Sequence, residues 1–476
     1  MLMRFIDREV ELNEFWKLNS LSRKKLFVVA LYGLRRVGKT RLLLEFLRDS
    51  ASGHGSSDET GYGFGGNGLY FFVNKNKTST DLLKEFQEVI RSVHVLGELE
   101  ELTSWDKFFE VLLTRESPPI VFDEFQNFKF VDPSVFGILQ KNIDLNENKP
   151  GMIILSGSLI GLMKKLFKNS KEPLYGRIKK GMKLEPLFLS SCFEIAKELK
   201  LEKEELVKLY FLFGGYPKYY VVLEDFGLQG KTAEEIIESL LLVKDAPLED
   251  EVNSILSQEF GGRSGVYYSI LEAIANGNNT LSKVAGYLNV PATSMTRQIN
   301  ELKDLFELIE LEMPYRGKRG VYRLRHPLLQ FWFSQIYKNY SDYISRKPEF
   351  ISSVKKNLNA FYGRCFERIS RDFLNNELKL VEAGRQWGKI QNAKKGENTY
   401  EIDLIGKNEN NTFVFEFKWA EIDYRKANAL IENLKAKSKH IEKLPEGLKF
   451  GLVARKIIDK QKLRKEGYLA YDLDDF

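Results

Sequence analysis

One short segment constrains the fold of this chain more than any other. Residues 33–40 read Gly-Leu-Arg-Arg-Val-Gly-Lys-Thr, between an apolar run at 24–33 and a helical pattern over 39–50. Glycines let the backbone curl so that successive N–H groups point at phosphate oxygens, at the positive end of the following helix. A lysine and a hydroxyl at this spacing contact the β- and γ-phosphates and Mg²⁺. The segment therefore predicts a loop that binds ATP and Mg²⁺, formed by Gly33, Leu34, Arg35, Arg36, Val37, Gly38, Lys39 and Thr40.

A second apolar run, PPIVFDEF at residues 118–125, ends in two acidic residues. A buried strand of a parallel sheet delivers such side chains to its carboxyl edge, where ligands bind. We expect Asp123 to hold Mg²⁺ through water, and Glu124 to orient and polarise the attacking water. The pair indicates an ATP hydrolase rather than a protein that only binds nucleotide.

Two further polar features follow in the same region. The strand expected over residues 151–158 ends in Ser156 and Ser158, which are predicted to sense the γ-phosphate between the loop and Asp123. An ordinary polar strand end is the equal alternative. Arg177 is predicted to be an arginine finger or sensor that acts on transition-state charge, in its own subunit or a neighbour's. A surface arginine in a turn is the alternative.

The first third of the chain alternates short apolar runs with amphipathic helical patterns. This alternation is typical of a parallel α/β sheet with crossover helices. Strands are expected at 24–33, 68–74, 118–125 and 151–158, and helices at 39–50, 80–94 and 104–115. The Gly/Ser-rich stretch at 50–68 is predicted to be a flexible insertion.

Composition excludes several other classes of protein. The chain has 2 cysteines, which excludes a disulfide framework and a cysteine-rich zinc site, and its 4 scattered histidines disfavour a histidine-built metal site. Charges interrupt every apolar run before the ~18 residues that would span a bilayer. The N-terminal residues MLMRFIDREV lack the pattern of a signal peptide. We therefore expect a soluble, cytoplasmic, multidomain protein with no membrane partner.

A set of motifs resembles a known family. In chain order they read FIDREVELNEFWKL, YGLRRVGKT, VFDEFQNF, LSGS, PLYGRI and GGYPKYY, and together they resemble the archaeal-type ATPases of the STAND class, relatives of the AAA+ proteins. The resemblance covers about residues 4–260. It implies that Phe5–Glu11 packs near the adenine, with Arg8 and Glu9 beside the base. It also implies that Gly214–Pro217 marks a lid-like helical region after the core.

Residues 266–325 show three helical patterns followed by a hairpin with the tip Arg-Gly-Lys-Arg-Gly. This order is typical of a winged helix, whose third helix enters the major groove while the wing contacts phosphates. The residues predicted to reach base edges are Thr296, Arg297 and Asn300, and those predicted to neutralise phosphates are Arg316, Lys318 and Arg319. The alternative is a module that packs on the nucleotide domain and reports its state without contacting DNA.

The last 120 residues or so carry a spaced set of acidic residues and a lysine. Glu367 lies on an amphipathic helix over 362–374, Asp403 on a strand, and Glu416 and Lys418 on the next strand. Residues two apart on a strand share a face. The set is the arrangement of a PD-(D/E)xK nuclease, in which the three carboxylates hold Mg²⁺ and the lysine positions or deprotonates the attacking water.

The same stretch also resembles the C-terminal domain that accompanies this ATPase family, through GRQWGK, EIDLI and EFKW. The alternative to a nuclease is a nuclease-like fold that only binds DNA or protein.

The charge of the chain is unevenly distributed. Residues 1–260 carry a net charge of −4, whereas residues 261–350 carry +4 and residues 351–476 carry +6. This asymmetry is compatible with nucleic-acid binding in the C-terminal half, and equally with a lysine-rich solvated surface.

These observations predict an α/β chain with a P-loop parallel sheet. The expected domains are an ATPase core (1–186), a helical lid (187–260), a winged helix (261–326), a helical bridge (327–350) and a PD-(D/E)xK-like α/β domain (351–476). The predicted function is ATP hydrolysis coupled to a DNA-acting module, with Mg²⁺-dependent cleavage as its candidate activity. DNA contacts are expected through 290–325 and 351–476, and the sequence is compatible with an oligomer. The alternative is a signalling or scaffold ATPase whose C-terminal half only binds DNA or protein.

Overall fold

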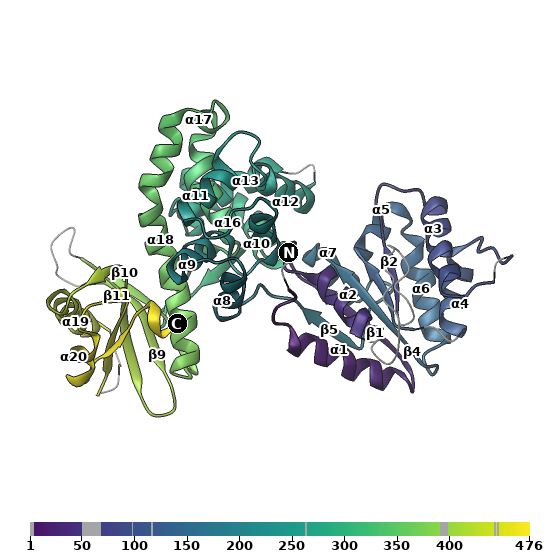
Figure 1. The fold of residues 1–476 in the computed structure, drawn as a ribbon, viewed down its shortest axis with the longest axis horizontal. Coiled ribbons are helices and arrows are strands. Elements are labelled where there is room, and N and C mark those ends of the chain that lie inside the picture. Colours follow the sequence, from purple (N-terminus) through teal and green to yellow (C-terminus); the bar gives the residue numbers. More distant parts are fainter. Residues whose placement is uncertain are drawn as a thin grey trace. The chain divides into compact units, whose positions relative to one another are not determined.

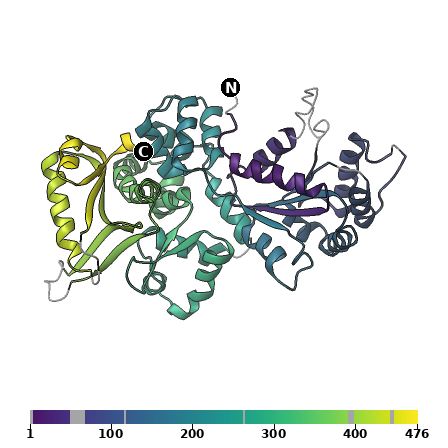
Figure 2. The ribbon, with the colours of Figure 1, turned by 90° about the horizontal axis from the view of Figure 1, so that it is seen from below.

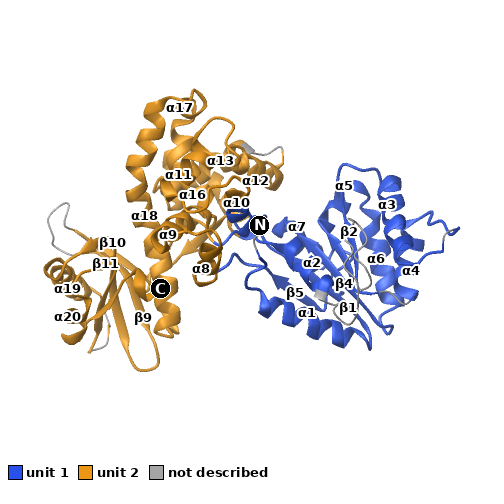
Figure 3. Ribbon diagram, in the orientation of Figure 1, with its two compact units in different colours: residues 1–187, 215–221, 304–307 blue, residues 188–214, 222–303, 308–476 orange. Residues whose placement is uncertain are grey.

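The fold is taken from a computed structural model of the full chain. It describes residues 4–49, 68–97, 99–115, 118–261, 264–390, 398–441, 444 and 447–476. The insertion predicted at 50–68 lies outside the described residues apart from Gly68. The chain forms two compact units, coloured separately in Figure 3. Unit 1 comprises residues 1–187, 215–221 and 304–307, and unit 2 comprises residues 188–214, 222–303 and 308–476.

Unit 1 is built on a five-stranded parallel sheet (Figure 1). Its strands, in spatial order, are β2 (Leu69–Phe72), β3 (Ile120–Asp123), β4 (Gly151–Gly157), β1 (Leu26–Tyr32) and β5 (Lys180–Lys183). The parallel α/β sheet predicted from the sequence is confirmed, and the four predicted strands are all present. The fifth strand, β5, was not predicted, because its sequence KGMK is polar and lies at the sheet edge, where it pairs only with β1.

The helices of unit 1 follow the pattern of crossover connections. They are α1 (Glu9–Ser22), α2 (Lys39–Asp49), α3 (Ser79–Ser92), α4 (Trp105–Thr114), α5 (Phe128–Val131), α6 (Ser134–Leu145) and α7 (Ile160–Lys168). Two of these helices start where a side chain accepts a backbone N–H: Thr78 caps α3 and Ser104 caps α4. Such caps satisfy one of the N–H groups left without a partner in the first turn of a helix.

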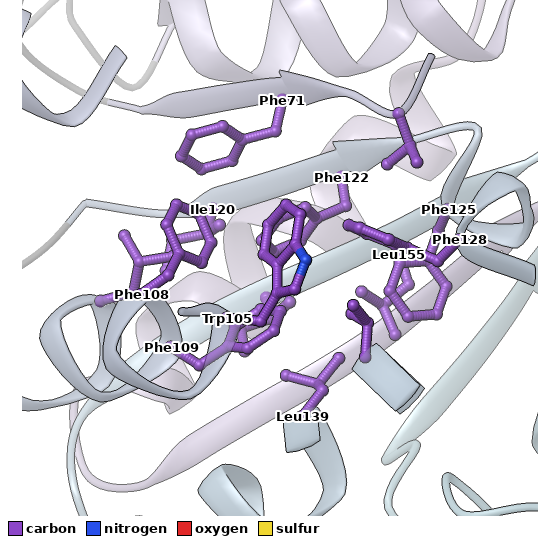
Figure 4. Close-up of a cluster of buried hydrophobic side chains, with 14 of the residues drawn as sticks. Phe71, Trp105, Phe108, Phe109, Ile120, Phe122, Phe125, Phe128, Leu139 and Leu155 are labelled. Carbon is purple, nitrogen blue, oxygen red and sulfur yellow. The ribbon is translucent and has the colours of Figure 1, made fainter. Parts of the chain in front are cut away.

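A core rich in aromatic side chains packs on one face of this sheet. Figure 4 shows Trp105 and Phe108 of α4 beside Phe71 and Phe122 of the neighbouring strands β2 and β3. The rings of Phe71 and Phe122 stack with centroids 5.1 Å apart. On β1, Val28 and Ala30 belong to this cluster while the alternate residues do not, as the two-residue period of a strand requires. Helix α1 packs on β1 and β4 and against α2.

Unit 2 begins with helices. Its helical segments include α8 (Leu189–Glu198), α9 (Lys203–Phe213), α10 (Pro217–Asp225, whose first residues belong to unit 1), α11 (Ala233–Ile237), α12 (Glu251–Phe260), α13 (Ser264–Ala275), α14 (Leu281–Tyr287), η3 (Ala292–Met295), α15 (Thr296–Asn300), η4 (Glu301–Leu305, whose last two residues belong to unit 1), α16 (Pro327–Phe331), α17 (Tyr340–Ile344), α18 (Pro348–Glu377), α19 (Tyr424–Ser438) and α20 (Lys460–Lys465). No helix among the described residues is both long enough and apolar enough to cross a membrane.

Unit 2 contains two sheets. A hairpin pairs β6 (Ile309–Glu312) with β7 (Val321–Leu324), and a five-stranded mixed sheet has the order β12 (Leu469–Tyr471), β11 (Lys449–Ile457), β10 (Thr412–Ile422), β9 (Thr399–Lys407) and β8 (Glu382–Lys389). Strands β8, β9 and β10 are antiparallel neighbours, whereas β11 runs parallel to β10 and β12 runs parallel to β11. Figure 2 shows this sheet in yellow-green with α19 along it.

The mixed sheet is covered by helices on both faces. Val414 of β10 clusters with Leu434 of α19. Trp419 lies an odd number of residues from Val414 on the same strand, and it packs on Phe366 of α18 with ring centroids 5.3 Å apart. Because alternate residues of a strand point to opposite faces, α18 and α19 cover opposite sides of β10. This central strand is the one that carries Glu416 and Lys418.

Candidate functional site

The predicted phosphate loop joins β1 to α2 in unit 1. Gly38 has φ 96° and Arg36 has φ 70°, the left-handed backbone that lets the loop turn back on itself. At Gly33 a Cβ atom would lie 2.4 Å from the carbonyl oxygen of Leu184, so only glycine fits there. Lys39 Nζ donates to the carbonyl oxygens of Gly33 at 2.9 Å and Leu34 at 3.0 Å. The loop thus surrounds a fixed ammonium group.

Asp123 lies beside this loop at the end of β3. Its Oδ2 accepts hydrogen bonds from Thr40 Oγ1 at 2.6 Å and from the hydroxyl of Tyr70 at 2.8 Å. Tyr70 is a residue that sequence reasoning missed, and its pKa is raised by burial and by the adjacent Asp123 charge. The signal that could have found it is its position on β2, the strand adjacent to β3. Thr40 and Asp123 therefore form one polar cluster, as their predicted shared role requires.

Glu124 stands directly after β3 with φ 53°, a strained conformation for a non-glycine residue. Its Oε2 accepts from Ser158 Oγ at 2.8 Å and from Gln126 Nε2. The strand β4, which carries Ser156 and ends one residue before Ser158, lies between β1 and β3 in the sheet. Ser158 thus contacts Glu124 directly, while Ser156 Oγ is buried and makes no hydrogen bond with the described residues.

Two segments from the family resemblance lie against the loop. Arg8 is buried and its Nη2 donates to the carbonyl oxygens of Val37 at 3.2 Å and Glu185 at 2.7 Å, whereas Glu9 is exposed. In Gly214–Pro217, a Cβ at Gly215 would lie 1.8 Å from Leu187 O. The Pro217 ring lies 3.9 Å from where a Cβ of Gly38 would stand. The start of α10 therefore borders the phosphate loop within unit 1.

Arg177 is placed elsewhere in unit 1. Its guanidinium forms a two-point ion pair with Asp144, with Nε–Oδ1 at 3.1 Å and Nη2–Oδ2 at 3.0 Å. This pair raises the pKa of Arg177. Residues 177 and 144 precede β5 and β4, whereas the loop follows the carboxyl end of β1 in the same parallel sheet. Arg177 thus lies near the amino-terminal ends of the strands, whereas the phosphate loop of the same chain lies at their carboxyl ends.

Two of the three predicted acidic residues of unit 2, Asp403 and Glu416, lie close together. Register pairs Phe415 of β10 with Leu404 of β9, and Glu416 and Asp403 are the residues that follow this pair on the two strands. Asp403 and Glu416 are 9% and 7% exposed. Asp403 Oδ2 accepts from the Phe417 N–H at 2.7 Å. Burial raises the pKa of Asp403, and the charge of Glu416 raises it further. Two buried carboxylates therefore lie on adjacent strands, close enough for their charges to interact.

Each of these carboxylates has basic neighbours. Lys418 Nζ donates to Glu416 Oε1 at 2.7 Å, and Lys437 Nζ of α19 donates to Glu416 Oε2 at 3.1 Å. Burial opposes the charged form of Lys418, but the charge and hydrogen bond of Glu416 outweigh it and the pKa of Lys418 is raised. Lys437 is a site residue that sequence reasoning missed.

Glu367 of α18 has a different environment. Burial, helped by the charge of Asp403, raises the pKa of Glu367 to about 7. Its Oε2 lies 3.8 Å from Arg385 Nε and 4.0 Å from Arg323 Nη2. Among the residues that the structure describes, no group of three or more His, Cys, Asp or Glu side chains is arranged to hold a metal ion. Asp403 and Glu416 are brought close together, while Glu367 lies within electrostatic range of Asp403.

The residues predicted to contact DNA are mostly exposed. Thr296, Arg297 and Asn300 lie on the exposed side of α15, and Arg297 pairs with Glu301 at 2.9 Å. The hairpin-tip side chains Arg316, Lys318 and Arg319 are also exposed.

Comparisons with known proteins agree with the geometry of unit 1. Residues 5–223 match a family model described as an ATPase domain predominantly from Archaea, and residues 332–430 match one described as archaeal and bacterial proteins of unknown function. An uncharacterized protein of Methanocaldococcus jannaschii is 29% identical over 491 residues, which cover 99% of this chain and 100% of the relative.

Two solved structures also resemble the chain. The Walker-type ATPase of Pyrococcus abyssi has a TM-score of 0.51 at 22% identity, covering 69% of this chain and 96% of that one. The ORC2 protein of Aeropyrum pernix has a TM-score of 0.49 at 14% identity, covering 74% and 96%. The first likeness shows the shared fold. The match of residues 5–223 to the ATPase-domain model confirms the ATP hydrolase predicted from the sequence.

Proposed function

We propose that this ATPase couples its nucleotide state to a DNA-acting module formed by the C-terminal half, and that the module cleaves DNA with a divalent cation. The observation that carries the second part is the buried pair Asp403 and Glu416, with Lys418 two residues further along the same strand. The proposal keeps the domain boundaries predicted from the sequence.

The residues at the phosphate loop fit ATP with Mg²⁺. Hydroxyl and carboxylate oxygens are the protein ligands that Mg²⁺ prefers. Thr40 Oγ1 and Asp123 Oδ2 lie 2.6 Å apart, and the Lys39 ammonium group lies on the carbonyl oxygens of the same loop. When bound, Mg²⁺ supplies charge neutralisation at the β- and γ-phosphate oxygens.

The chain's own residues then divide the work of hydrolysis. Lys39 exchanges its two carbonyl contacts for phosphate oxygens, since a charged acceptor makes the stronger hydrogen bond. Glu124 accepts a proton from the attacking water, and Ser158 and Gln126 hold its carboxylate in place. Arg177, paired with Asp144, is proposed to act on the nucleotide of a neighbouring subunit in an oligomer.

The C-terminal half supports a DNA-acting module in two ways. Helices α13, α14 and α15 followed by the β6–β7 hairpin have the element order of a winged helix, and Thr296, Arg297 and Asn300 share an exposed face. In the mixed sheet, Asp403 and Glu416 provide two carboxylates, enough for a Mg²⁺ ion that keeps several waters. Lys418 then positions the water that attacks the phosphodiester.

A second candidate is a signalling or scaffold ATPase whose C-terminal half only binds DNA or protein. A specific observation favours it: both carboxylate oxygens of Glu416 are engaged by lysines. Such a site is neutralised by the chain itself and needs no cation.

The test measures cleavage of plasmid and single-stranded DNA with Mg²⁺ or Mn²⁺, with and without ATP. Wild type is compared with Lys418→Ala and Lys39→Ala. We expect cleavage that is lost in Lys418→Ala and that changes with ATP only when Lys39 is present. No cleavage under any condition, with ATP hydrolysis intact, would reject the nuclease and favour the signalling ATPase.

A further inference from the structure

The hairpin of residues 309–324 is docked on the edge of the mixed sheet within unit 2. Backbone N–H groups at its tip donate to β8: Tyr315 N to Arg385 O at 2.7 Å and Arg316 N to Gln386 Oε1 at 2.7 Å. A Cβ built at Gly384 would lie 3.6 Å from the Cβ of Tyr315. The tip therefore runs along β8 in close contact, and the backbone predicted to form a DNA-binding wing is engaged by the chain itself.

Behind the tip, three arginines surround one carboxylate of the hairpin. Glu312 of β6 pairs with Arg371 of α18, with Arg323 of β7 at 2.5 Å and with Arg385 of β8 at 3.5 Å. Side chains of Glu312, Arg371 and Arg385 are only 14% to 15% exposed. Because Arg323 belongs to the same hairpin as Glu312, removal of the hairpin would leave Arg371 and Arg385 without that carboxylate, while Arg385 would keep its ion pair with Glu401 of β9.

This arginine pair borders the proposed cleavage site. Arg385 Nε lies 3.8 Å from Glu367 Oε2, and the charges of Asp403 and Lys418 act on Glu367 in turn. Guanidinium groups bind phosphate as readily as carboxylate, through paired N–H donors in a planar fork. A largely buried carboxylate held by several arginines next to the proposed cleavage site takes the place that a phosphate group would take.

We propose that Arg371 and Arg385 form a binding site for a backbone phosphate of DNA, and that Glu312 occupies this site whenever the hairpin is docked on β8. The inference rests on the proposed DNA-acting function and deepens it. DNA enters only when the hairpin leaves, so the docked hairpin is a built-in competitor for the same arginines. Arg323, which departs with the hairpin, also stops contacting Glu367.

A covalent lock tests the competition directly. A Cβ–Cβ separation of 3.6 Å at Tyr315 and Gly384 lies within the range of a disulfide. In the full chain, Tyr315→Cys with Gly384→Cys should therefore crosslink on oxidation. We expect the oxidised form to bind duplex DNA about tenfold more weakly than the reduced form, since phosphate contacts dominate such affinity. Wild type, which keeps Cys192 and Cys365, should not change with the same redox treatment.

A charge variant tests the role of the carboxylate. Glu312→Gln keeps the size of the side chain but removes its attraction for the arginines, so DNA binding should tighten and its salt dependence should steepen by about one phosphate contact. Glu310→Gln is the matched control, because Glu310 lies on the same strand and pairs with Arg325 at 3.6 Å instead. In a Glu312→Gln background, Arg371→Ala should abolish the gain.

The possible results separate the site from the function. Equal DNA binding by the oxidised and reduced double-cysteine variants rejects the competition while leaving the DNA-acting function intact. Failure of the crosslink to form shows that the hairpin is not docked on β8 and also rejects it. Absence of DNA binding in every form, wild type included, rejects the DNA-acting function and the phosphate site with it. Weaker binding in Glu312→Gln assigns Glu312 a structural role only.

Discussion

The acidic residues of the two units are held by opposite kinds of partner. In unit 1, Asp123 accepts from the hydroxyls of Thr40 and Tyr70, and Glu124 accepts from the neutral side chains of Ser158 and Gln126. In unit 2, Glu416 is paired with two lysines and Glu367 lies beside arginines. Neutral donors orient a carboxylate without cancelling its charge, whereas cationic partners satisfy the charge itself. The comparison teaches that Asp123 and Glu124 keep their charge available, whereas the charges of Glu416 and Glu367 are offset by cationic groups of the chain itself.

The largest expected effect comes from a substitution at Glu124, the carboxylate that is held by neutral partners. Glu124→Gln removes the base that accepts a proton from water, so kcat for ATP hydrolysis should fall by a factor on the order of 10² to 10⁴. Nucleotide affinity should persist, because Lys39 and Thr40 are untouched. Steady-state hydrolysis and binding of a fluorescent nucleotide provide the two measurements. A variant that still hydrolyses ATP at the wild-type rate would show that Glu124 is not the base.

The contrast in burial and charge predicts a pH dependence in unit 2. The pKa of Glu367 is raised to about 7, above that of an unfolded glutamate, so the folded chain binds the proton more tightly. Its contribution to stability is therefore complete below the unfolded pKa and is lost as pH rises through about 7, a change of up to about 3 kcal/mol.

Glu367→Gln imitates the protonated form and should remove this loss. The thermal midpoint of the variant should exceed that of wild type at pH 8 and approach it at pH 5. Glu377→Gln, an exposed position on the same helix, should behave like wild type at both values. A Glu367→Gln variant that is less stable at pH 8 would mean that the arginine contacts of Glu367 outweigh its burial.

A smaller effect on kcat is expected from the neutral hydrogen-bond partners of Glu124 in unit 1. Ser158→Ala removes one hydrogen bond to Glu124, which contributes about 1 kcal/mol, so kcat should fall roughly fivefold with KM unchanged. Ser156→Ala is the matched control, because its hydroxyl makes no hydrogen bond with the described residues. An equal loss in the Ser156 variant, with raised KM, would instead favour the predicted sensing of the γ-phosphate by both serines.

Local spacing accounts for what the sequence could reveal of fold and site. The phosphate loop and the Asp123–Glu124 pair each lie within eight residues, and the strand and helix that flank them are apolar or amphipathic enough to be recognised. The four buried strands of unit 1 were predicted for the same reason. Strand β5 escaped because a polar edge strand has no such signal, and its pairing with β1 depends on residues about 150 positions apart.

Long-range ion pairs and hydrogen bonds account for what the sequence could not reveal. Tyr70, Lys437 and the arginines around Glu312 acquire their partners only through folding. The docking of the hairpin on β8 joins segments 70 residues apart through the N–H groups of Tyr315 and Arg316, and backbone donors carry no residue-specific pattern. Arg177 is the converse case. Its motif predicted a role at the nucleotide, but its partner Asp144 lies near the amino-terminal ends of the strands, away from the phosphate loop.

The smallest expected effect is on local stability, and it tests whether the two units unfold independently of each other. Gly137 lies inside α6 of unit 1 and Gly363 inside α18 of unit 2, and a Cβ at either would meet no atom within 4 Å. Gly→Ala at each position should therefore stabilise its own helix by about 0.5–1 kcal/mol. Amide hydrogen exchange should slow around α6 in Gly137→Ala and around α18 in Gly363→Ala.

Gly33→Ala is the contrasting control, because its Cβ would lie 2.4 Å from Leu184 O and should destabilise unit 1. Slower exchange in both units from either helix variant would show that the chain opens as one cooperative body. The neutral site and the cation-paired site could not then be tuned separately. Slower exchange confined to one unit in each case would mean that loosening of the arginine-held hairpin need not disturb the phosphate loop.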